Sequence, residues 1–346
     1  MRIAIVTDAW RPQVNGVVTT LTKTGESLAA MGHEVRFVTP ASFRTVPCPT
    51  YPEIRLSLWP ARRLARVLDE FQPEAVHIAT EGPLGLAARR YCRRRGLAFT
   101  TSYHTQFPQY VRLRLPVPIA WCYAYLRWFH GAAARTLVPT EHQREELAAW
   151  GFANLVIWSR GVDTELFRPR ERDAAAGERP LNLMYMGRVA VEKNIEAFLS
   201  LDLPGRKYVV GDGPDLPALR ARHPDVQFTG FRFGEELART LAGADVFVFP
   251  SRTDTFGLVM LEAMACGVPV AAYPVTGPLD VVLDGVTGAL DEDLRRAVQR
   301  ALTVDRSACR EQALQYSWRR CSEQFHSHLA VNTRPLEQPL PAHEPR

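Results

Sequence analysis

The feature that most limits what this chain can fold into is a repeated alternation of short apolar runs with amphipathic stretches. Nearly continuous runs of apolar, often β-branched residues are typical of strands buried on both faces of a parallel sheet. In the first half these runs are Ile3–Val6, Glu34–Val38, Ala75–Ile78 and Leu97–Thr101. The helical patterns are Val18–Met31, Ala61–Phe71, Leu84–Arg95 and His142–Trp150. This alternation predicts a doubly wound α/β domain.

The alternation stops at residues 168–180, a charged, alanine-rich stretch bounded by prolines, which we interpret as a linker. It then resumes, with strands predicted at Leu181–Met186, Tyr208–Val210, Val226–Thr229, Val246–Phe249 and Pro269–Ala272. We therefore predict an α/β protein of two Rossmann-like domains, residues 1–167 and 181–308, that face each other across a cleft. A C-terminal helix over 309–330 is expected to pack back toward the first domain, followed by a frayed tail over 331–346.

Composition excludes several classes of protein. The 346 residues are 46% hydrophobic and 23% charged, which argues against a disordered chain, a fibrous repeat or a polytopic membrane protein. The six cysteines show neither C-x-x-C nor zinc-ligand spacing, so we expect reduced thiols of a cytosolic protein. The chain begins directly with a strand pattern, so no signal peptide is expected.

Charge is distributed unevenly between the two halves. Residues 1–170 carry 22 Lys and Arg against 13 Asp and Glu, whereas residues 171–346 carry 20 against 24. A basic half is suited to nucleic acid, to an anionic membrane surface or to a phosphorylated substrate. Charge alone leaves these three partners open, and motifs must decide among them.

The most informative motif runs from Phe249 to Val270. A strand pattern ends in a polar loop, Gly257 permits a turn, and a helix begins. Loop amides at a helix N-terminus favour an anionic or hydroxyl-rich ligand. Asp254 lies in the loop and Glu262 two turns into the helix, where two carboxylates can accept hydrogen bonds from different hydroxyls of one extended ligand. The structural alternative is that Asp254 only caps the helix and that Glu262 is only a buried polar residue.

A second motif, Met186 to Asn194, also joins a strand to a helix and contains Arg188 and Lys193. Ligands of α/β proteins bind at such strand ends. Arginine can hydrogen-bond two phosphate oxygens at once, and lysine adds a single positive charge. The two together are suited to neutralising a diphosphate leaving group. A solvated loop is the alternative, but Lys193 is one of only three lysines in the chain.

Together these motifs resemble the nucleotide-sugar site of retaining GT-B glycosyltransferases in family four. There an acidic residue and a Glu, with seven residues between them, precede Ala-x-Ala-x-Gly-x-Pro-Val; Asp254 stands where Glu is usual. The resemblance implies that Glu262 binds the ribose hydroxyls and that Arg188 and Lys193 neutralise the diphosphate without a metal ion. It also implies that the donor sugar is held by Asp254 and by the amides of Thr255, Phe256 and Gly257.

Motifs of the first half fit the same resemblance. Gly16, in the first strand-to-helix junction, is assigned to the donor β-phosphate or to the acceptor side. His104, in Tyr-His-Thr, is expected to lie against the transferred sugar as a catalytic residue, with a structural histidine as the alternative. Glu81 is expected to line the acceptor pocket. Asp291 and Asp293 form the only Asp-x-Asp pair in the sequence, but we interpret them as acidic residues at a helix N-terminus and not as a metal site.

Basic and aromatic residues of the first domain suggest a membrane. Arginines concentrate in two predicted helices, and aromatic residues cluster between Trp121 and Phe129. Arginines in a last helical turn, or core aromatics, would explain them without a ligand. Together they favour peripheral contact with anionic lipid on the inner face of the membrane. Nucleic acid is not expected as a partner, because no recognition motif accompanies the charge.

We therefore predict a retaining hexosyltransferase with no cofactor and no metal. It would transfer a hexose from a nucleoside-diphosphate sugar, of the UDP-glucose or UDP-glucuronate type or GDP-mannose, to a lipid acceptor such as diacylglycerol. The alternatives are a GDP-mannose-dependent mannosyltransferase acting on a soluble glycan and a nucleotide-sugar epimerase on the same fold. A dinucleotide oxidoreductase would need a G-x-G-x-x-G motif, which the chain lacks. A further alternative is a protein that binds the sugar nucleotide without catalysis. Such a protein would keep its affinity for the donor when Arg188 or Lys193 is replaced by alanine, and it would have no catalytic activity to lose.

Overall fold

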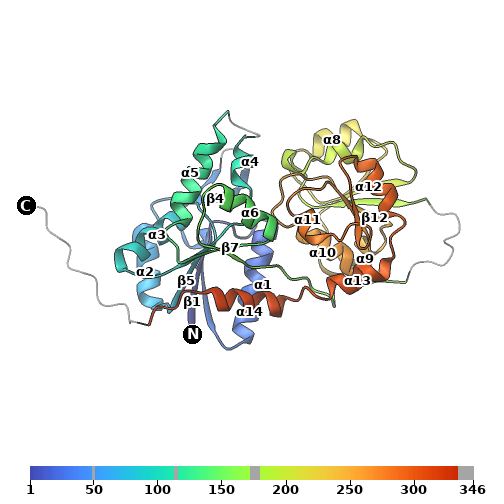
Figure 1. The fold of residues 1–346 in the computed structure, drawn as a ribbon. Helices are drawn as coiled ribbons and strands as arrows, with labels where there is room; N and C mark the ends of the chain where they lie inside the picture. The colour runs from blue at the N-terminus through green and yellow to red at the C-terminus, as the bar shows by residue number, and fades with distance from the viewer. Residues whose placement is uncertain (49–50, 113–115, 172–179, 334–346) are drawn as a thin grey trace, which may run out of the picture.

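The computed structural model describes residues 1–48, 51–112, 116–171 and 180–333. Within them the chain forms two six-stranded sheets, each parallel throughout, in two domains that lie side by side (Figure 1). Most of the predicted linker, residues 172–179, and most of the predicted tail, residues 334–346, lie outside the described residues.

The first domain has the strand order β2-β1-β5-β6-β7-β8. Its strands are β1 (Arg2–Val6), β2 (Glu34–Val38), β5 (Ala75–Ile78), β6 (Thr100–Ser102), β7 (Arg135–Val138) and β8 (Leu155–Ile157). Its helices are α1 (Gly16–Ala30), α2 (Ala61–Phe71), α3 (Pro83–Arg95), α4 (Phe107–Arg112), α5 (Ile119–His130) and α6 (Glu141–Ala149). A 3-10 turn, η1 (Pro40–Ser42), and an antiparallel hairpin, β3 (Thr45–Cys48) and β4 (Tyr51–Ser57), extend the connection after β2.

The second domain has the strand order β11-β10-β9-β12-β13-β14. Its strands are β9 (Asn182–Met186), β10 (Arg206–Val210), β11 (Gln227–Gly230), β12 (Val246–Phe249), β13 (Val270–Ala272) and β14 (Gly288–Leu290). Its helical segments are η2 (Val191–Lys193), α7 (Ile195–Leu199), α8 (Leu216–Arg222), α9 (Gly234–Ala242), α10 (Leu258–Ala265), α11 (Pro278–Val281), α12 (Leu294–Ala301) and α13 (Arg306–Ala313).

Both sheets are covered on both faces, as the apolar runs predict. In β1, Ile3 and Ile5 pack in one core cluster with α1 and α14 (Trp318–His328), while Ala4 and Val6 pack in another with α2 and α3. All four side chains are fully buried. Alternate residues of a strand point to opposite faces, so only a run that is apolar throughout can fill two cores.

The chain crosses between the domains twice, and the two crossings touch. Residues 158–167 lead out of the first domain, and residues 314–317 lead back to α14, which packs on α1 (Figure 1). The Val162 amide donates to the Tyr316 carbonyl over 2.9 Å. A Cβ on Gly161 would lie 2.6 Å from the Trp318 nitrogen, so no larger residue fits there.

Two predicted elements differ from the structure. The strand predicted at Leu97–Thr101 is formed by Thr100–Ser102, because Gly96 ends α3 in a left-handed conformation and the Leu97 amide still bonds back to Cys92. The region predicted as one helix over 309–330 contains the end of α13 and the whole of α14, because the chain crosses between domains there and Ser317 caps a new helix.

Candidate functional site

The loop between β12 and α10 is shaped by its glycine. Gly257 has a φ of 83°, and a Cβ there would lie 2.7 Å from the Cε atom of Met260. Any other residue would be both strained and crowded. The turn brings the amides that precede α10 to the helix N-terminus, where the helix dipole favours negative charge.

Lys193 and Asp254 form the charged centre of this site. The Lys193 Nζ atom lies 2.5 Å from Asp254 Oδ1, and the two side chains are only 18% and 17% exposed. Burial opposes the charge on Lys193, but Asp254 and the nearby Tyr110 and Tyr185 outweigh burial and raise the pKa of the ammonium. The lysine is therefore a fixed cation. The second oxygen of Asp254 is buried without a hydrogen-bond partner among the described residues, so this carboxylate has an acceptor position to spare.

The loops that carry these two residues are bound together by short polar contacts. The hydroxyls of Ser251 and Thr253 both donate to the Glu192 carbonyl, the second over 3.2 Å. The Asn194 amide group donates to the Pro250 carbonyl over 3.0 Å. Residues between 56 and 61 positions apart in the chain are thereby held in one arrangement, as the prediction that these motifs form one site requires.

Arg188 follows β9 in a half-buried position. Its carbonyl accepts a 2.7 Å hydrogen bond from the buried Tyr185 hydroxyl. A Cβ on Gly211 would lie 1.9 Å from the Gly187 carbonyl oxygen, so the glycine turn after β10 must pack backbone to backbone beneath this loop.

Glu262 lies in the second turn of α10, half-buried, and the described residues provide no hydrogen-bond partner for its carboxyl group. Burial raises its pKa to about 7. Near neutral pH the carboxyl group is therefore present in both its protonated and ionised forms. Such a group both donates to and accepts from ligand hydroxyls, consistent with the sugar-hydroxyl role expected for it.

Gly16 brings the first domain to this site. It is the first residue of α1, whose N-terminus is capped by the Asn15 side chain bonding the Val18 amide over 3.0 Å. A Cβ on Gly16 would lie 3.4 Å from the Cδ1 atom of Leu258, the first residue of α10. Two helix N-termini therefore meet at this point, and both of their dipoles favour an anion.

His104 also lies at the domain junction, but its ring is held inside the first domain. Nε2 lies 2.8 Å from the Ser102 hydroxyl and Nδ1 lies 3.3 Å from an Arg160 nitrogen. Burial, with Arg160, His77 and His130 nearby, holds its pKa well below the usual value. Across the junction it is the His104 carbonyl that accepts a hydrogen bond, from the Thr255 hydroxyl. Its expected contact with a sugar stays a prediction.

Sequence reasoning did not single out three residues at the junction. Tyr110 on α4 is close enough to the second domain that Lys193, Asp254 and Thr253 influence it, and burial raises its pKa to about 12. His142 on α6 contacts Asp280 on α11 over 2.8 Å. Only the meeting of two domains creates these contacts, so no local pattern announces them.

The remaining predicted groups lie away from this centre. Glu81 accepts from His130 Nε2 over 3.1 Å, and its carbonyl accepts from the Tyr125 hydroxyl. Among the described residues, no group of three or more His, Cys, Asp or Glu side chains is placed to hold a metal ion. The expectation that no metal is needed is not tested by this observation.

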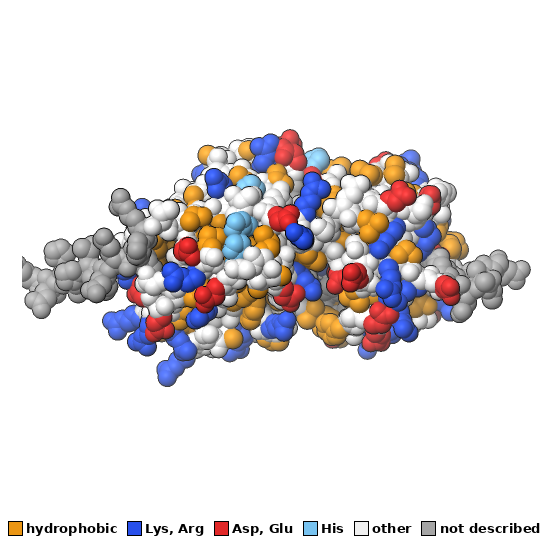
Figure 2. Space-filling view, turned by 90° about the horizontal axis from the view of Figure 1, so that it is seen from below, with side chains coloured by type: hydrophobic (Ala, Val, Ile, Leu, Met, Phe, Trp, Pro, Cys, Tyr) orange, Lys and Arg blue, Asp and Glu red, His pale blue; other side chains and the backbone are white. Residues whose placement is uncertain are grey.

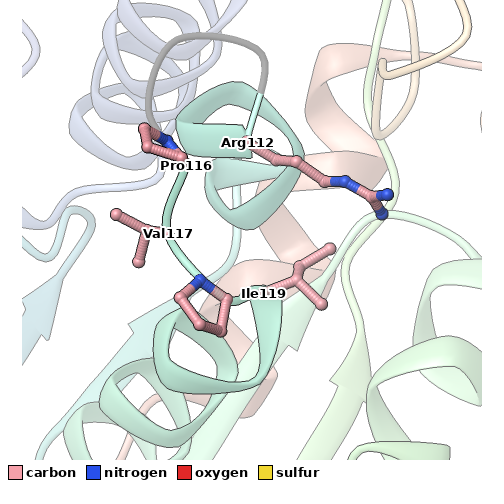
Figure 3. A pocket seen from close by; sticks show the side chains of 5 residues that line it. Arg112, Pro116, Val117 and Ile119 are labelled. Atoms are coloured by element: carbon pink, nitrogen blue, oxygen red, sulfur yellow. The ribbon is translucent and has the colours of Figure 1, made fainter.

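A pocket of about 590 Å³ lies where α4 leads into α5 (Figure 3). It is lined by Arg112, Pro116, Val117, Pro118 and Ile119. Beyond it, α5 exposes Trp121 and Trp128, at 70% and 52% of their surface. Figure 2 shows Lys and Arg side chains at the end of the first domain, on its left, with Asp and Glu side chains among them, and both charges also on the second domain. In the described part of the chain, no helix combines the length and apolar character needed to cross a bilayer.

Known proteins share both halves of this architecture. Residues 14–166 match the family model described as Glycosyltransferase Family 4, and residues 180–304 match Glycosyl transferases group 1. A GDP-mannose-dependent alpha-mannosyltransferase of Mycobacterium tuberculosis is 34% identical over 84% of this chain and 83% of its own length. Alpha-monoglucosyldiacylglycerol synthase of Streptococcus pneumoniae is 27% identical over 87% and 78%. Sucrose-phosphate synthase of Thermosynechococcus elongatus has a similar structure, with a TM-score of 0.76, 22% identity, and coverage of 94% and 97%.

Proposed function

The chain belongs to glycosyltransferase family 4 and is a hexosyltransferase with the GT-B fold, and from this premise we propose that it transfers mannose from GDP-mannose to a lipid acceptor with retention of configuration. The observation that carries the proposal is the Lys193–Asp254 pair beside the N-termini of α10 and α1. The mannosyltransferase relative at 34% identity supports the donor, and the diacylglycerol-glycolipid synthase supports the acceptor class.

The donor would lie with its diphosphate toward Arg188, Lys193 and the two helix N-termini. Glu262 would bind the ribose, while Asp254 and the amides of Thr255, Phe256 and Gly257 would hold the sugar. Gly16 supports this arrangement because it keeps the first turn of α1 open beside Leu258. The spare acceptor atom of Asp254 supports a sugar hydroxyl as its partner.

Transfer would take place on one face of the sugar. The acceptor oxygen bonds to the anomeric carbon while the bond from that carbon to the β-phosphate oxygen breaks. The departing phosphate takes the proton of the acceptor hydroxyl, so charge balances without a separate base. Negative charge grows on the phosphate as the bond breaks, and preorganised cations at Arg188 and Lys193 stabilise the transition state more than the ground state.

The acceptor would reach the first domain from an anionic membrane surface. The exposed indoles of Trp121 and Trp128 project from α5, and α2 and α3 of the same domain carry exposed arginines. These arginines are Arg62, Arg63, Arg66, Arg90, Arg93 and Arg94. Indoles at the interface and guanidiniums near anionic headgroups are a combination suited to peripheral binding on the inner face of the membrane.

The proposal is tested with purified protein in EDTA. GDP-mannose, UDP-glucose and UDP-glucuronate are each offered with vesicles containing diacylglycerol or a glycosylated diacylglycerol, and separately with a soluble oligosaccharide. We expect turnover with GDP-mannose and the vesicles, a product retaining the α-configuration, and no loss of rate in EDTA. Transfer only to the soluble glycan would reject the lipid acceptor, and a strict Mg²⁺ requirement would reject a metal-free phosphate site. Conversion of the donor sugar without any acceptor would identify an epimerase.

A further inference from the structure

Arg160 is a buried cation that the proposed reaction does not use. Only 4% of the residue is exposed. Its guanidinium donates to the Trp158 and Ser159 carbonyls over 2.6 and 3.2 Å and lies 4.4 Å from the centre of a Trp158 ring. It forms no ion pair with a carboxylate of the described residues. Burial lowers its pKa to about 10, so it keeps its charge at neutral pH. Burying a cation is unfavourable unless polar contacts compensate for the lost water. The remaining polar contact of Arg160 therefore matters for its role.

That contact is with His104. An Arg160 nitrogen lies 3.3 Å from His104 Nδ1, and a guanidinium only donates, so Nδ1 must accept. A neutral His104 then carries its proton on Nε2 and donates to the Ser102 hydroxyl over 2.8 Å. The Ser102 hydroxyl, which accepts from His104, also lies 3.1 Å from His77 Nε2, and His77 Nδ1 lies 2.9 Å from the Thr100 hydroxyl. The buried guanidinium therefore sets the direction of two successive hydrogen bonds, from Arg160 to His104 and from His104 to Ser102.

Arg160 also lies beside the place where the two chain crossings meet. The next residue, Gly161, packs against the Trp318 backbone so closely that a Cβ would lie 2.6 Å from its nitrogen. Arg160 also contacts the ring of His104, whose carbonyl accepts a hydrogen bond from the Thr255 hydroxyl over 2.8 Å. Thr255 lies in the loop between β12 and α10, which we call the donor loop. The Arg160 side chain thus connects the interdomain crossing at Gly161 to the hydrogen bond between Thr255 and His104 that joins the two domains.

We propose that Arg160 is a positioning residue: by donating to His104 Nδ1 it fixes the ring as the Nε2–H tautomer and holds the His104 carbonyl where Thr255 meets it. The proposal deepens the proposed function, because the contact it maintains lies at the proposed sugar site. The charged and titratable groups facing His104 are Arg160 itself, His77 and His130, and none of them is an acid. The ring therefore stays neutral as well as fixed.

The first test observes the histidine directly. The protein is labelled with ¹⁵N-histidine, and ring nitrogen shifts are compared between wild type, Arg160→Met and Arg160→Lys, with His104→Gln used to assign the resonance. We expect Nε2–H in the wild type from pH 6 to 8, a mixture of tautomers or a titrating ring in Arg160→Met, and partial restoration in Arg160→Lys. Arg135→Met, which removes a surface arginine that donates to the His328 carbonyl, is the matched control. An unchanged His104 signal in folded Arg160→Met would overturn the proposal.

The second test uses turnover. We expect kcat/KM for the donor to fall about 10-fold in Arg160→Met, with partial rescue by lysine and no change in Arg135→Met. Wild-type activity in a folded Arg160→Met would overturn the proposal. If that variant does not fold, Ser102→Ala removes the other ring contact and must disturb the His104 signal and turnover in the same way, or the proposal fails. The tautomer measurement needs no substrate, so failure of the proposed donor or acceptor would leave this test intact.

Discussion

The Thr255 hydroxyl donates a 2.8 Å hydrogen bond to the His104 carbonyl, so the donor loop of the second domain touches a strand end of the first. Replacing Thr255 by valine keeps the side-chain shape but removes the donor. A hydrogen bond of this kind contributes about 0.5–1.5 kcal/mol, so we expect kcat/KM to fall about 3- to 10-fold. Steady-state kinetics on the donor measure this. Thr303→Val, which removes an exposed hydroxyl bonded within its own helix end, is expected to leave kcat/KM unchanged.

Loss of the Lys193 ammonium is expected to affect both catalysis and stability. In Lys193→Met the leaving phosphate loses a preorganised cation, and we expect kcat to fall about 100- to 1000-fold. Asp254 is left without its ion partner, so the free energy of unfolding is expected to fall by about 1–3 kcal/mol. Kinetics and urea unfolding measure the two effects. Lys207→Met, which removes an ammonium that donates to the Leu199 and Leu201 carbonyls, provides the comparison, and equal kcat in both variants would contradict the assigned role.

Glu262 is expected to make stability depend on pH. Burial raises its pKa from 4.5 to about 7, so the folded state retains a proton that the unfolded state has already lost. This group therefore makes the protein less stable as pH rises from about 4.5 to 7, with no further loss above that range. Glu262→Gln removes this contribution. We expect the variant to be more stable than wild type at pH 8 but not at pH 4.5, measured by denaturant unfolding. Parallel stability curves for the two proteins would show that Glu262 does not titrate as described.

The His142–Asp280 contact is expected to weaken as pH rises. The hydrogen bond to Asp280 raises the pKa of His142, with Glu141 and Glu145 of the same helix contributing. A histidine with a raised folded pKa stabilises the folded arrangement below about pH 6.5, and this contribution is lost as pH rises through the folded value. Because the pair joins α6 to α11, the two domains are expected to separate more readily at pH 8 than at pH 6. Small-angle scattering of wild type and His142→Gln measures this, and an identical pH response in both would exclude the pair as its source.

Membrane binding is expected to depend on α5. The double variant Trp121→Ser, Trp128→Ser removes two exposed indoles, and we expect weaker cosedimentation with anionic vesicles. Binding of the wild type is expected to weaken as salt increases, because the arginines act through screened charge. Phe231→Ser with Phe233→Ser removes two exposed aromatics of the second domain and serves as the control. Equal loss in both double variants would argue against a docking surface on the first domain.

Much of this fold follows from local pattern. The all-apolar runs at Ile3–Val6 and Val246–Phe249 predict strands buried on both faces, and both strands lie inside their sheets. The hairpin β3–β4 was not predicted, because each of its strands contains a proline and neither strand alternates clearly. The break between α13 and α14 was missed for a different reason. Helical propensity continues across residues 309–330, and only the return of the chain to the first domain interrupts it.

The sequence by itself determined the two-domain α/β architecture and the residue types at the donor loops, because burial periodicity and strand-to-helix junctions are local properties. Only the tertiary structure decided the pairing of Lys193 with Asp254, the approach of Gly16 to Leu258 and the orientation of His104 by Arg160. Those relationships join segments between 56 and 242 residues apart, counted from the residue numbers. They exist only after both sheets have formed and the chain has crossed between them twice, so no window of sequence contains the information.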